Sequence, residues 1–427
     1  MSLRSPAPTE ATPPAVGSGW TRALCWTTVT LEGFDIVALS ASLPTILDTA
    51  HVGIDKAAAT FITTISLVGI LVGALMVGPI SDRLGRKSSL LGSIALFSVL
   101  TLVVPWAGDV TTFAALRFFA GIGLGACMPV ALTMMSETVR PSQRARGATL
   151  AMTGYHTGAL LTALVGLVVM PDWEWLFILG GVVGLLALPV MWVKLPETSE
   201  VVLARRGGEK ADDRVPLSAL LTKPFVVASV ATWAASFMGL LLVYGLISWL
   251  PTIMKEAGYE LSTSLVMLFL LNLGGVAGLV LAGFVGDARG IRPSAILWFV
   301  AAAVFLGLLS VRMPTLLLDA AVFVTGIFVF SAQVLVYAWI TRSFPSDVRG
   351  TALGLASGVG RLGSIVGPAI TGALVTAGIA YPWGFYVFSG VAVLAVLAMI
   401  AVPRRLEQEG EAFQKAHRLA AEEAAAR

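Results

Sequence analysis

Apolar segments long enough to cross a lipid bilayer fill most of this chain. A membrane-spanning helix needs about 20 consecutive, mostly apolar residues. Of the 427 residues, 57% are hydrophobic and only 12% are charged, about half the charge of a soluble domain. Such a chain cannot cover a water-facing surface, so the sequence predicts an all-α membrane protein. We place twelve transmembrane helices at residues 20–43, 58–80, 88–106, 112–135, 147–169, 174–193, 224–248, 262–282, 293–311, 315–338, 351–376 and 383–402.

A polar stretch after the sixth span divides the series into two groups of six. It carries several Lys and Arg residues and is predicted to be a cytoplasmic linker. The expected organisation is a cytoplasmic tail rich in Pro, Ser and Thr, a first six-helix bundle, the linker, a second bundle and a second cytoplasmic tail. The boundaries are 1–19, 20–194, 195–223, 224–403 and 404–427.

The positions of the 28 Lys and Arg residues predict the orientation of the chain. Basic residues gather in the cytoplasmic loops of membrane proteins. With both termini in the cytoplasm, only Lys56, Lys255 and Arg312 fall on the opposite side, and Arg117 and Arg361 lie within spans. The reverse orientation would reverse this bias, so we expect both termini inside.

Two loops recur at corresponding places in the two halves. Residues 78–87 join spans two and three, and residues 283–292 join spans eight and nine, with Gly, Asp, Gly and a final base at matching offsets. A second match links residues 141–147 with residues 345–350, where Pro-Ser leads to Arg-Gly. This repetition indicates a duplicated six-helix unit, and such units build transporters with a binding site at the interface of the repeats.

The motifs resemble those of a known family. The loop 78–87 resembles the signature between helices two and three of the major facilitator superfamily. The segment Glu32-Gly33-Phe34-Asp35 resembles the acid-Gly-aromatic-Asp motif of its aromatic acid:proton symporter branch, and residues 117–129 resemble the fourth helix of that branch. The resemblance covers about residues 20–402.

What the resemblance implies is a fold of two pseudo-symmetric six-helix bundles, working as a monomer in a bacterial-type inner membrane. It also implies uptake of a small aromatic carboxylate together with protons, without a cofactor.

Ionisable residues inside the spans are expensive and normally face a partner or a cavity. Depth follows from the helical rise of 1.5 Å per residue. Glu32, His156 and Arg361 then lie ~15 Å from the cytoplasmic end, near the membrane midplane. Transporters bind substrate at that depth.

Asp35 and Arg117 are predicted to share a second depth, closer to the outer surface. An acid and a base at one depth on different helices can pair, which lowers the cost of burying each. Glu32 and Asp35 are three positions apart and share a helix face, so protonation of one relieves their repulsion. We expect Asp35 to be the main proton-coupling site, in exchange with Arg117 and assisted by Glu32. The alternative is a permanent structural ion pair.

A fixed guanidinium at the midplane suits bidentate binding of a carboxylate. Arg361 is therefore assigned to the substrate carboxylate, the alternative being a structural partner for Glu32. His156 is expected to donate to the substrate or join a proton relay, or else to serve in packing. Further residues assigned to the substrate site by their span positions are Asn272, Tyr155 and Gln333. Four aromatic residues could also line the cavity, but packing or anchoring at the membrane interface is favoured for any one of them; they are Tyr244, Trp249, Tyr337 and Trp339.

The loop signature is expected to govern conformational switching. Asp82 stands at the C-terminal end of span two, where a negative charge opposes the helix dipole and needs compensation, for example from Arg146. The family resemblance implies a latch that closes the inner side. The residues assigned to the switch are Gly78, Asp82, Arg83, Gly85, Arg86, Arg146 and Asp287.

Other functions remain open or are disfavoured. A proton-coupled porter of another organic acid, a sugar or a drug is the nearest alternative, and a membrane receptor is a more distant one. No Walker loop, clustered metal ligands or nucleophile motif supports an enzyme. The net charge of +3 and the lack of a basic stripe argue against a nucleic-acid partner.

Overall fold

The computed structural model describes residues 18–138, 144–196, 220–404 and 406. Within these residues, twelve helices are long and apolar enough to cross a membrane, as the sequence predicted. Of the predicted tails and linker, residues 1–17, 197–219, 405 and 407–427 lie outside the described part. The helices are α1 Ser18–Asp48, α2 Lys56–Leu84, α3 Arg86–Val103, α4 Val110–Thr138, α5 Arg144–Val169, α6 Glu174–Lys194, α8 Val226–Glu256, α9 Leu261–Arg289, α10 Ile291–Leu308, α11 Thr315–Ser343, α12 Ser346–Thr376 and α13 Ala380–Ala401, with short 3₁₀ turns at His51–Gly53 and Val104–Trp106.

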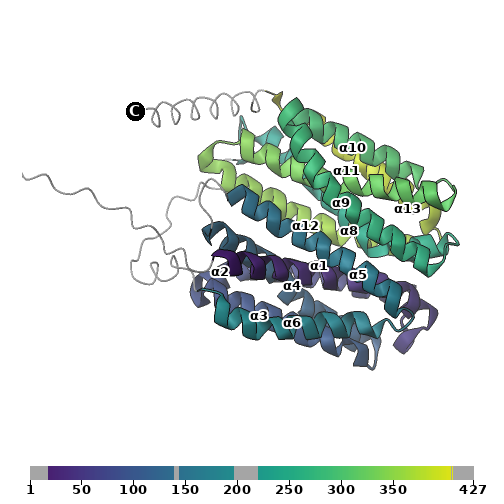
Figure 1. Ribbon diagram of the computed structural model, residues 1–427. Coiled ribbons are helices and arrows are strands. Elements are labelled where there is room, and N and C mark those ends of the chain that lie inside the picture. The colour runs from purple at the N-terminus through teal and green to yellow at the C-terminus, as the bar shows by residue number, and fades with distance from the viewer. Residues whose placement is uncertain (1–17, 139–143, 197–219, 405, 407–427) are drawn as a thin grey trace, which may run out of the picture.

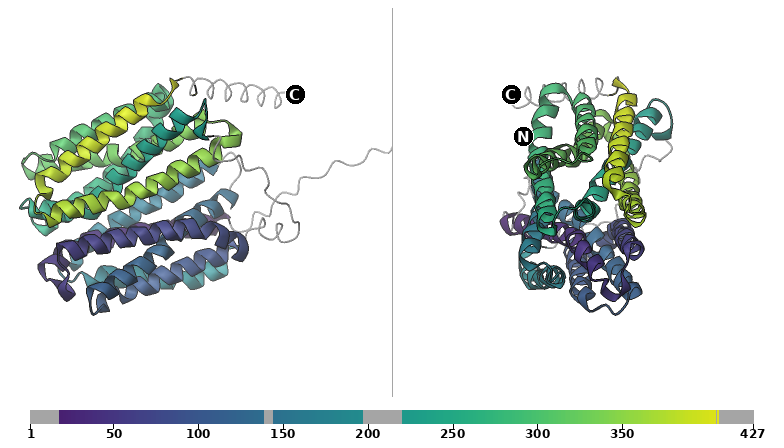
Figure 2. Two further views of the ribbon diagram at one scale, coloured as in Figure 1. Left: turned by 180° about the vertical axis from the view of Figure 1, so that it is seen from behind. Right: turned by 90° about the vertical axis from the view of Figure 1, so that its right-hand side faces the viewer.

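The helices form two bundles with the same internal pairing. Figure 1 shows α1 to α6 on one side and α8 to α13 on the other, and the views of Figure 2 agree. In the first half α1 packs on α5, α2 on α4, and α3 on α4 and α6. In the second half α8 packs on α12, α9 on α11, and α10 on α11 and α13. Helix by helix these are the same pairs, which confirms the twofold repeat seen in the sequence.

The interface between the halves repeats as well. It consists of α1 against α8, α2 against α12, and α5 against α9. The second and third pairs are exchanged by the pseudo-symmetry, and the first pair is symmetric in itself. Residues on these six helices can therefore face one another across the interface.

Pro44 does not end the first helix, contrary to the expectation that span one stops there. The helix continues to Asp48 with Pro44 inside it. A proline removes one main-chain hydrogen bond, but a helix packed on its neighbours tolerates that loss. Leu43 and Ile46, on either side of the proline, are 2% and 1% exposed, so packing holds this last turn in place.

The repeated loop glycines have a shared backbone conformation. Gly85 joins α2 to α3 with φ 95° and ψ 153°, and Gly290 joins α9 to α10 with φ 87° and ψ 149°. Residues with a Cβ atom are strained at such positive φ values. The two loops therefore turn identically in the two halves, and glycine is what allows the turn.

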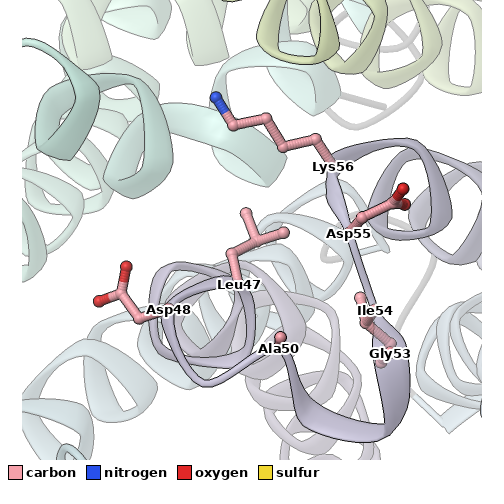
Figure 3. A pocket seen from close by; sticks show the side chains of 7 residues that line it. All are labelled: Leu47, Asp48, Ala50, Gly53, Ile54, Asp55 and Lys56. Carbon is pink, nitrogen blue, oxygen red and sulfur yellow. The ribbon is translucent and has the colours of Figure 1, made fainter.

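Ion pairs join the halves at the end of the bundle opposite the start of α1, which we call the distal end. Lys56 at the start of α2 pairs with Glu256 at the end of α8, and Asp48 at the end of α1 pairs with Lys255. Asp48 and Lys56 help to line a pocket of about 360 Å³ together with residues of the turn that joins α1 to α2, and Figure 3 shows these side chains. Both lysines lie on the side where the orientation rule expects few bases, and each has an acidic partner.

The distal ends of α1 and α8 also contact each other directly. The hydroxyl of Ser40 donates to the carbonyl of Ile247 at 2.5 Å, and Lys255 donates to the carbonyl of Pro44 at 3.4 Å. Leu250, Ile253 and other apolar side chains there are fully buried. In this structure the distal end is closed.

The distal starts of α2 and α4 are capped by aspartates. Asp55 accepts a hydrogen bond from the backbone N–H of Ala58 at 2.7 Å. Asp109 accepts one from the backbone N–H of Thr112 at 2.8 Å and one from its hydroxyl at 2.9 Å. These bonds, led by the backbone one, lower the pKa of Asp109. A charged acid at a helix N-terminus also complements the helix dipole.

We predict that reversing one charge of the distal ion pairs opens this end. Exposed ion pairs contribute up to about 1 kcal/mol, so Lys255→Glu should raise the population of the open form by up to about fivefold. The measurement is maleimide labelling of a Ser40→Cys variant in nanodiscs. The native Cys25 and Cys127 are 0% exposed and give little background.

The control adds Asp48→Lys, which restores opposite charges and should return labelling to its original rate. Equal labelling in all three proteins would show that the Asp48–Lys255 pair does not hold the distal end closed.

Candidate functional site

Asp35 of α1 and Arg117 of α4 form a buried ion pair. The guanidinium Nη1 lies 2.9 Å from one carboxylate oxygen and 3.2 Å from the other, and both side chains are 1% exposed. Thr101 of α3 donates its hydroxyl to the same carboxylate at 2.7 Å. The pairing predicted from helix depth is confirmed, and the partners of Asp35 among the described residues come from the first half.

Further contacts hold Arg117 in place. Its Nη2 lies 3.4 Å from the hydroxyl of Ser66 on α2, and its guanidinium lies 5.7 Å from the centre of the Phe177 ring on α6. A cation over an aromatic face gains electrostatic energy, more so away from water. The Asp35–Arg117 pair therefore ties α1, α2, α3, α4 and α6 together at one point.

Glu32 stands on the same face of α1 but has a different environment. Its side chain is 0% exposed, and within the described part of the chain neither carboxyl oxygen has a hydrogen-bond partner. A buried carboxylate without a partner is strongly unfavourable. The charge that interacts with Glu32 is that of Arg361 on α12, in the second half. The thiol of Cys127 on α4 is also close to Glu32.

The glycine between the two acids brings α5 against α1. A Cβ atom at Gly33 would collide with the backbone of Tyr155. Gly158 on α5 meets the backbone of Thr30 and Phe34 in the same way. Only glycine permits this approach of two helix backbones. The motif thus fixes the two acids relative to Tyr155.

Arg361 is the centre of a cluster drawn from both halves. Its charge interacts with Tyr244 of α8, Glu32 of α1, Tyr337 of α11 and Tyr155 of α5. Tyr155 and Tyr244 lie close enough for their hydroxyl groups to interact. The guanidinium Nη1 is buried and has no hydrogen-bond partner among the residues that the structure describes. The cluster therefore offers one cation and three phenolic hydroxyl groups, a set of donors suited to an anion.

His156 lies beside this cluster at the α5–α9 contact. Its ring meets the ring of Phe330 edge-on with centroids 5.0 Å apart, and it faces the side chain of Asn272 on α9. Asn272 donates its amide to the carbonyl of Leu268 at 2.9 Å. The Nδ1 of His156 and the Oδ1 of Asn272 are both buried without a partner. The structure therefore places His156 beside Asn272 rather than beside Glu32 and Arg361.

Gln333 of α11 belongs to a third group of polar side chains. Its amide donates to the hydroxyl of Ser236 on α8 at 2.9 Å, and that hydroxyl lies 3.5 Å from the hydroxyl of Tyr337. Ser236 in turn donates to the carbonyl of Ala356 on α12 at 2.7 Å. Gln333 is thus linked to the Arg361 cluster through Tyr337, and its own Oε1 has no partner.

The residues assigned to switching are only partly described. The side chains of Asp82 and Arg146 lie outside the described residues, so their expected pairing stays a prediction. Gly78 and Arg83 lie in α2, and Arg86 starts α3 after Gly85. Asp287, the counterpart of Asp82 in the second half, pairs with Arg342 of α11 at 2.5 Å. An acid at this helix end is thus compensated by a neighbouring helix in the second half.

Sequence reasoning left several of these contacts unassigned. For Tyr244 and Tyr337 the sequence favours packing or anchoring at the membrane interface over lining the cavity, yet both interact with the charge of Arg361. Trp249 and Trp339 are 0% exposed, which agrees with the favoured packing role, and Trp249 donates its indole N–H to the carbonyl of Pro368 at 3.0 Å. Nothing in the sequence marks Thr101 as a hydrogen-bond donor to Asp35, because a threonine in an apolar helix usually bonds to its own backbone.

Comparisons with known proteins agree with this architecture. The model of the Major Facilitator Superfamily matches residues 25–331 and 268–423. The solved structure of a D-xylose-proton symporter superimposes with a TM-score of 0.76 at 19% identity, covering 91% of this chain and 98% of the symporter. At that identity the likeness concerns the fold alone.

Curated relatives are more similar in sequence. The 3-(3-hydroxy-phenyl)propionate transporter of Escherichia coli is 33% identical over 83% of this chain and 86% of its own length. The gentisate transporter of Corynebacterium glutamicum is 30% identical, with 89% and 86% covered. The benzoate transport protein of Acinetobacter baylyi is 29% identical, with 88% and 86% covered.

We predict that Asp35→Asn destabilises the protein, because it leaves the Arg117 charge buried without a counter-charge. Removing one partner of a buried pair costs about 3 kcal/mol. The measurement is thermal unfolding of the purified protein in detergent. As the control, Asp35→Asn combined with Arg117→Met removes both charges and should recover most of the stability. A single variant as stable as the unaltered protein would contradict a structural role for the pair.

Proposed function

The chain belongs to the major facilitator superfamily of membrane transporters, and we propose that it carries a small aromatic carboxylate into the cell together with protons. The membrane is a bacterial-type inner membrane with both chain termini in the cytoplasm. Transport proceeds by alternating access, in which the two halves rock about a central site. The working unit is a monomer, and protons rather than a bound cofactor supply the energy.

The observation that carries this proposal is the Arg361 cluster at the interface of the halves. A guanidinium binds a carboxylate through two parallel N–H groups. Among the described residues the Nη1 of Arg361 has no hydrogen-bond partner, and its charge interacts with Tyr155, Tyr244 and Tyr337. Tyrosine rings and the neighbouring Phe330 and His156 provide aromatic surface for a ring, since aromatic pairs favour edge-on and offset contacts.

The relatives support the same substrate class. The transporters named for benzoate, gentisate and 3-(3-hydroxy-phenyl)propionate are each named for a molecule with an aromatic ring and one carboxylate. We extend that class to this chain, with Arg361 holding the carboxylate and with Asn272, His156 and Gln333 reaching substituents of the ring. Each of these three side chains has a buried polar atom without a partner, which a ring substituent would satisfy.

Switching between the two access states involves the loop signature and the ion pairs. The loop residues close the opposite end of the bundle, where α1 starts, and the Asp287–Arg342 pair holds α9 to α11 there within the second half. These residues are Gly78, Asp82, Arg83, Gly85, Arg86, Arg146 and Asp287. The pairs of Lys56 with Glu256 and of Asp48 with Lys255 close the distal end. Each access state then breaks one set of contacts and forms the other.

Other transport functions fit the site less well. A sugar has no carboxylate to engage Arg361, and a cationic drug would be repelled by it. A membrane receptor would bind but not translocate. Counterflow in proteoliposomes separates these cases, because only a carrier exchanges external labelled substrate for internal unlabelled substrate.

We predict counterflow of labelled 4-hydroxybenzoate that unlabelled benzoate inhibits and benzamide does not. Benzamide has the same ring but no negative charge for Arg361. Inhibition by benzamide as strong as by benzoate, or an absence of exchange with any aromatic acid tested, would contradict the proposal.

We also predict that Arg361→Lys weakens substrate affinity by about 10- to 100-fold. Lysine keeps the charge but loses the two parallel donors, and hydrogen bonds to charged groups contribute about 1.5–3 kcal/mol. The affinity is read from the concentration dependence of counterflow. Arg312→Lys is the matched control, because Arg312 contacts the Tyr381 ring at the distal end and should leave the affinity unchanged. Equal affinities in all three proteins would exclude Arg361 from carboxylate binding.

A further inference from the structure

We propose that Glu32 carries the coupling proton, that one proton accompanies each carboxylate, and that the transport cycle therefore moves no net charge. This inference rests on the proposed function, since it concerns the same substrate site. It differs from the assignment favoured by the sequence, which gave the main coupling role to Asp35.

The two acids of α1 have opposite surroundings. The carboxylate of Asp35 accepts two contacts from Arg117 and one from Thr101, so adding a proton would break an existing ion pair. The two oxygens of Glu32 accept no hydrogen bond from any described residue. Adding or removing a proton at Glu32 breaks no hydrogen bond of the fold. Glu32 is therefore the acid whose charge can change within a cycle.

The groups that face Glu32 come from four other helices. They are Arg361 of α12, Tyr155 of α5, Tyr244 of α8 and Cys127 of α4. Arg361 is the one cation among them, and Tyr337 of α11 adds a hydroxyl group to its surroundings. The site thus holds one group of fixed positive charge and one group of variable negative charge.

Charge balance follows from this composition. With the site empty, ionised Glu32 and Arg361 neutralise each other. With a carboxylate bound, Arg361 is neutralised by the substrate, and an ionised Glu32 would leave one excess negative charge. An uncompensated charge away from water is very costly. A proton on Glu32 removes it, and the resulting carboxyl O–H can donate to the substrate carboxylate, which is a strong hydrogen bond.

Two states of the site are therefore neutral, and two are charged. The neutral states are the empty site with ionised Glu32, and the loaded site with protonated Glu32. Substrate without a proton, or a proton without substrate, leaves a net charge at the interface. If only neutral states pass through the closed conformation, each turnover takes one proton and one carboxylate in the same direction.

The position of Glu32 also connects its charge to the motion of the halves. The partners of Asp35 and Arg117 named above are all in α1 to α6, so rocking of the halves leaves that pair intact. Arg361, Tyr244 and Tyr337 belong to the second half. Rocking changes the distance between Glu32 and Arg361, and with it the ease of releasing a proton from Glu32.

The first test is Glu32→Gln in proteoliposomes with labelled 4-hydroxybenzoate near neutral pH, where the acid is an anion. The amide can donate to the substrate as protonated glutamate would, but it cannot release a proton. We expect counterflow to continue at a rate within about tenfold of the unaltered protein. We expect accumulation driven by an inward proton gradient to be lost. Protein-free liposomes give the passive background.

The matched control is Asp35→Asn, three residues away on the same helix. Among correctly folded molecules of this variant, any remaining uptake should still respond to the proton gradient. The opposite pattern, with gradient-driven accumulation kept by Glu32→Gln and lost by Asp35→Asn while counterflow remains, would overturn the proposal and return the coupling role to Asp35.

The second test uses the unaltered protein and so does not depend on whether a variant folds. A potassium gradient with valinomycin sets an inside-negative potential. If one extra positive charge entered with each substrate, accumulation would rise about tenfold for every ~59 mV. We expect no change with potential and a full response to the proton gradient. A potential-driven rise would overturn electroneutral coupling while leaving aromatic acid transport in place, whereas an absence of any uptake or counterflow would reject the proposed function itself.

Discussion

The cost of holding charge inside an apolar bundle decides how the middle of this molecule is arranged. Asp35 and Arg117 reduce that cost by forming an ion pair at 2.9 Å, and Thr101 donates a further hydrogen bond to the Asp35 carboxylate. Arg361 has no such partner at its Nη1 and is surrounded by tyrosines instead. Neither carboxyl oxygen of Glu32 has a hydrogen-bond partner among the described residues. The Asp35–Arg117 pair is suited to stabilising the fold. Arg361 can still bind a ligand, and Glu32 can still bind a proton.

Much of this could be predicted from the sequence, because depth in a membrane is a one-dimensional quantity. Apolar length gives the number of helices, and counting 1.5 Å per residue brings Asp35 to the height of Arg117. The same count placed His156 with Glu32 and Arg361, yet the structure sets it against Asn272 and Phe330.

Direction around the helix axis explains that difference. Successive helical residues point about 100° apart, so Tyr155 faces Arg361 while His156, next along the chain, faces α9. Depth alone does not contain this information, and the glycine contact of α1 with α5 that sets the rotation depends on both helices together. Tyr244 and Tyr337 escaped assignment for a related reason: a tyrosine in a span is equally typical of the membrane interface.

The two kinds of contact between the halves connect the central site to the ends of the bundle. At the distal end, Lys56 and Lys255 each pair with an acid of the opposite half, and these exposed pairs contribute little energy individually. At the centre, Glu32 and Arg361 face each other across the same interface. Opening the distal end requires the halves to separate there. This separation alters the distal ion pairs and the distance between Glu32 and Arg361 at the same time. The distal ion pairs are weak and easily broken, so they do not by themselves decide which conformation is populated. In our proposal the net charge of the Glu32–Arg361 site decides whether the halves can pass through the closed conformation.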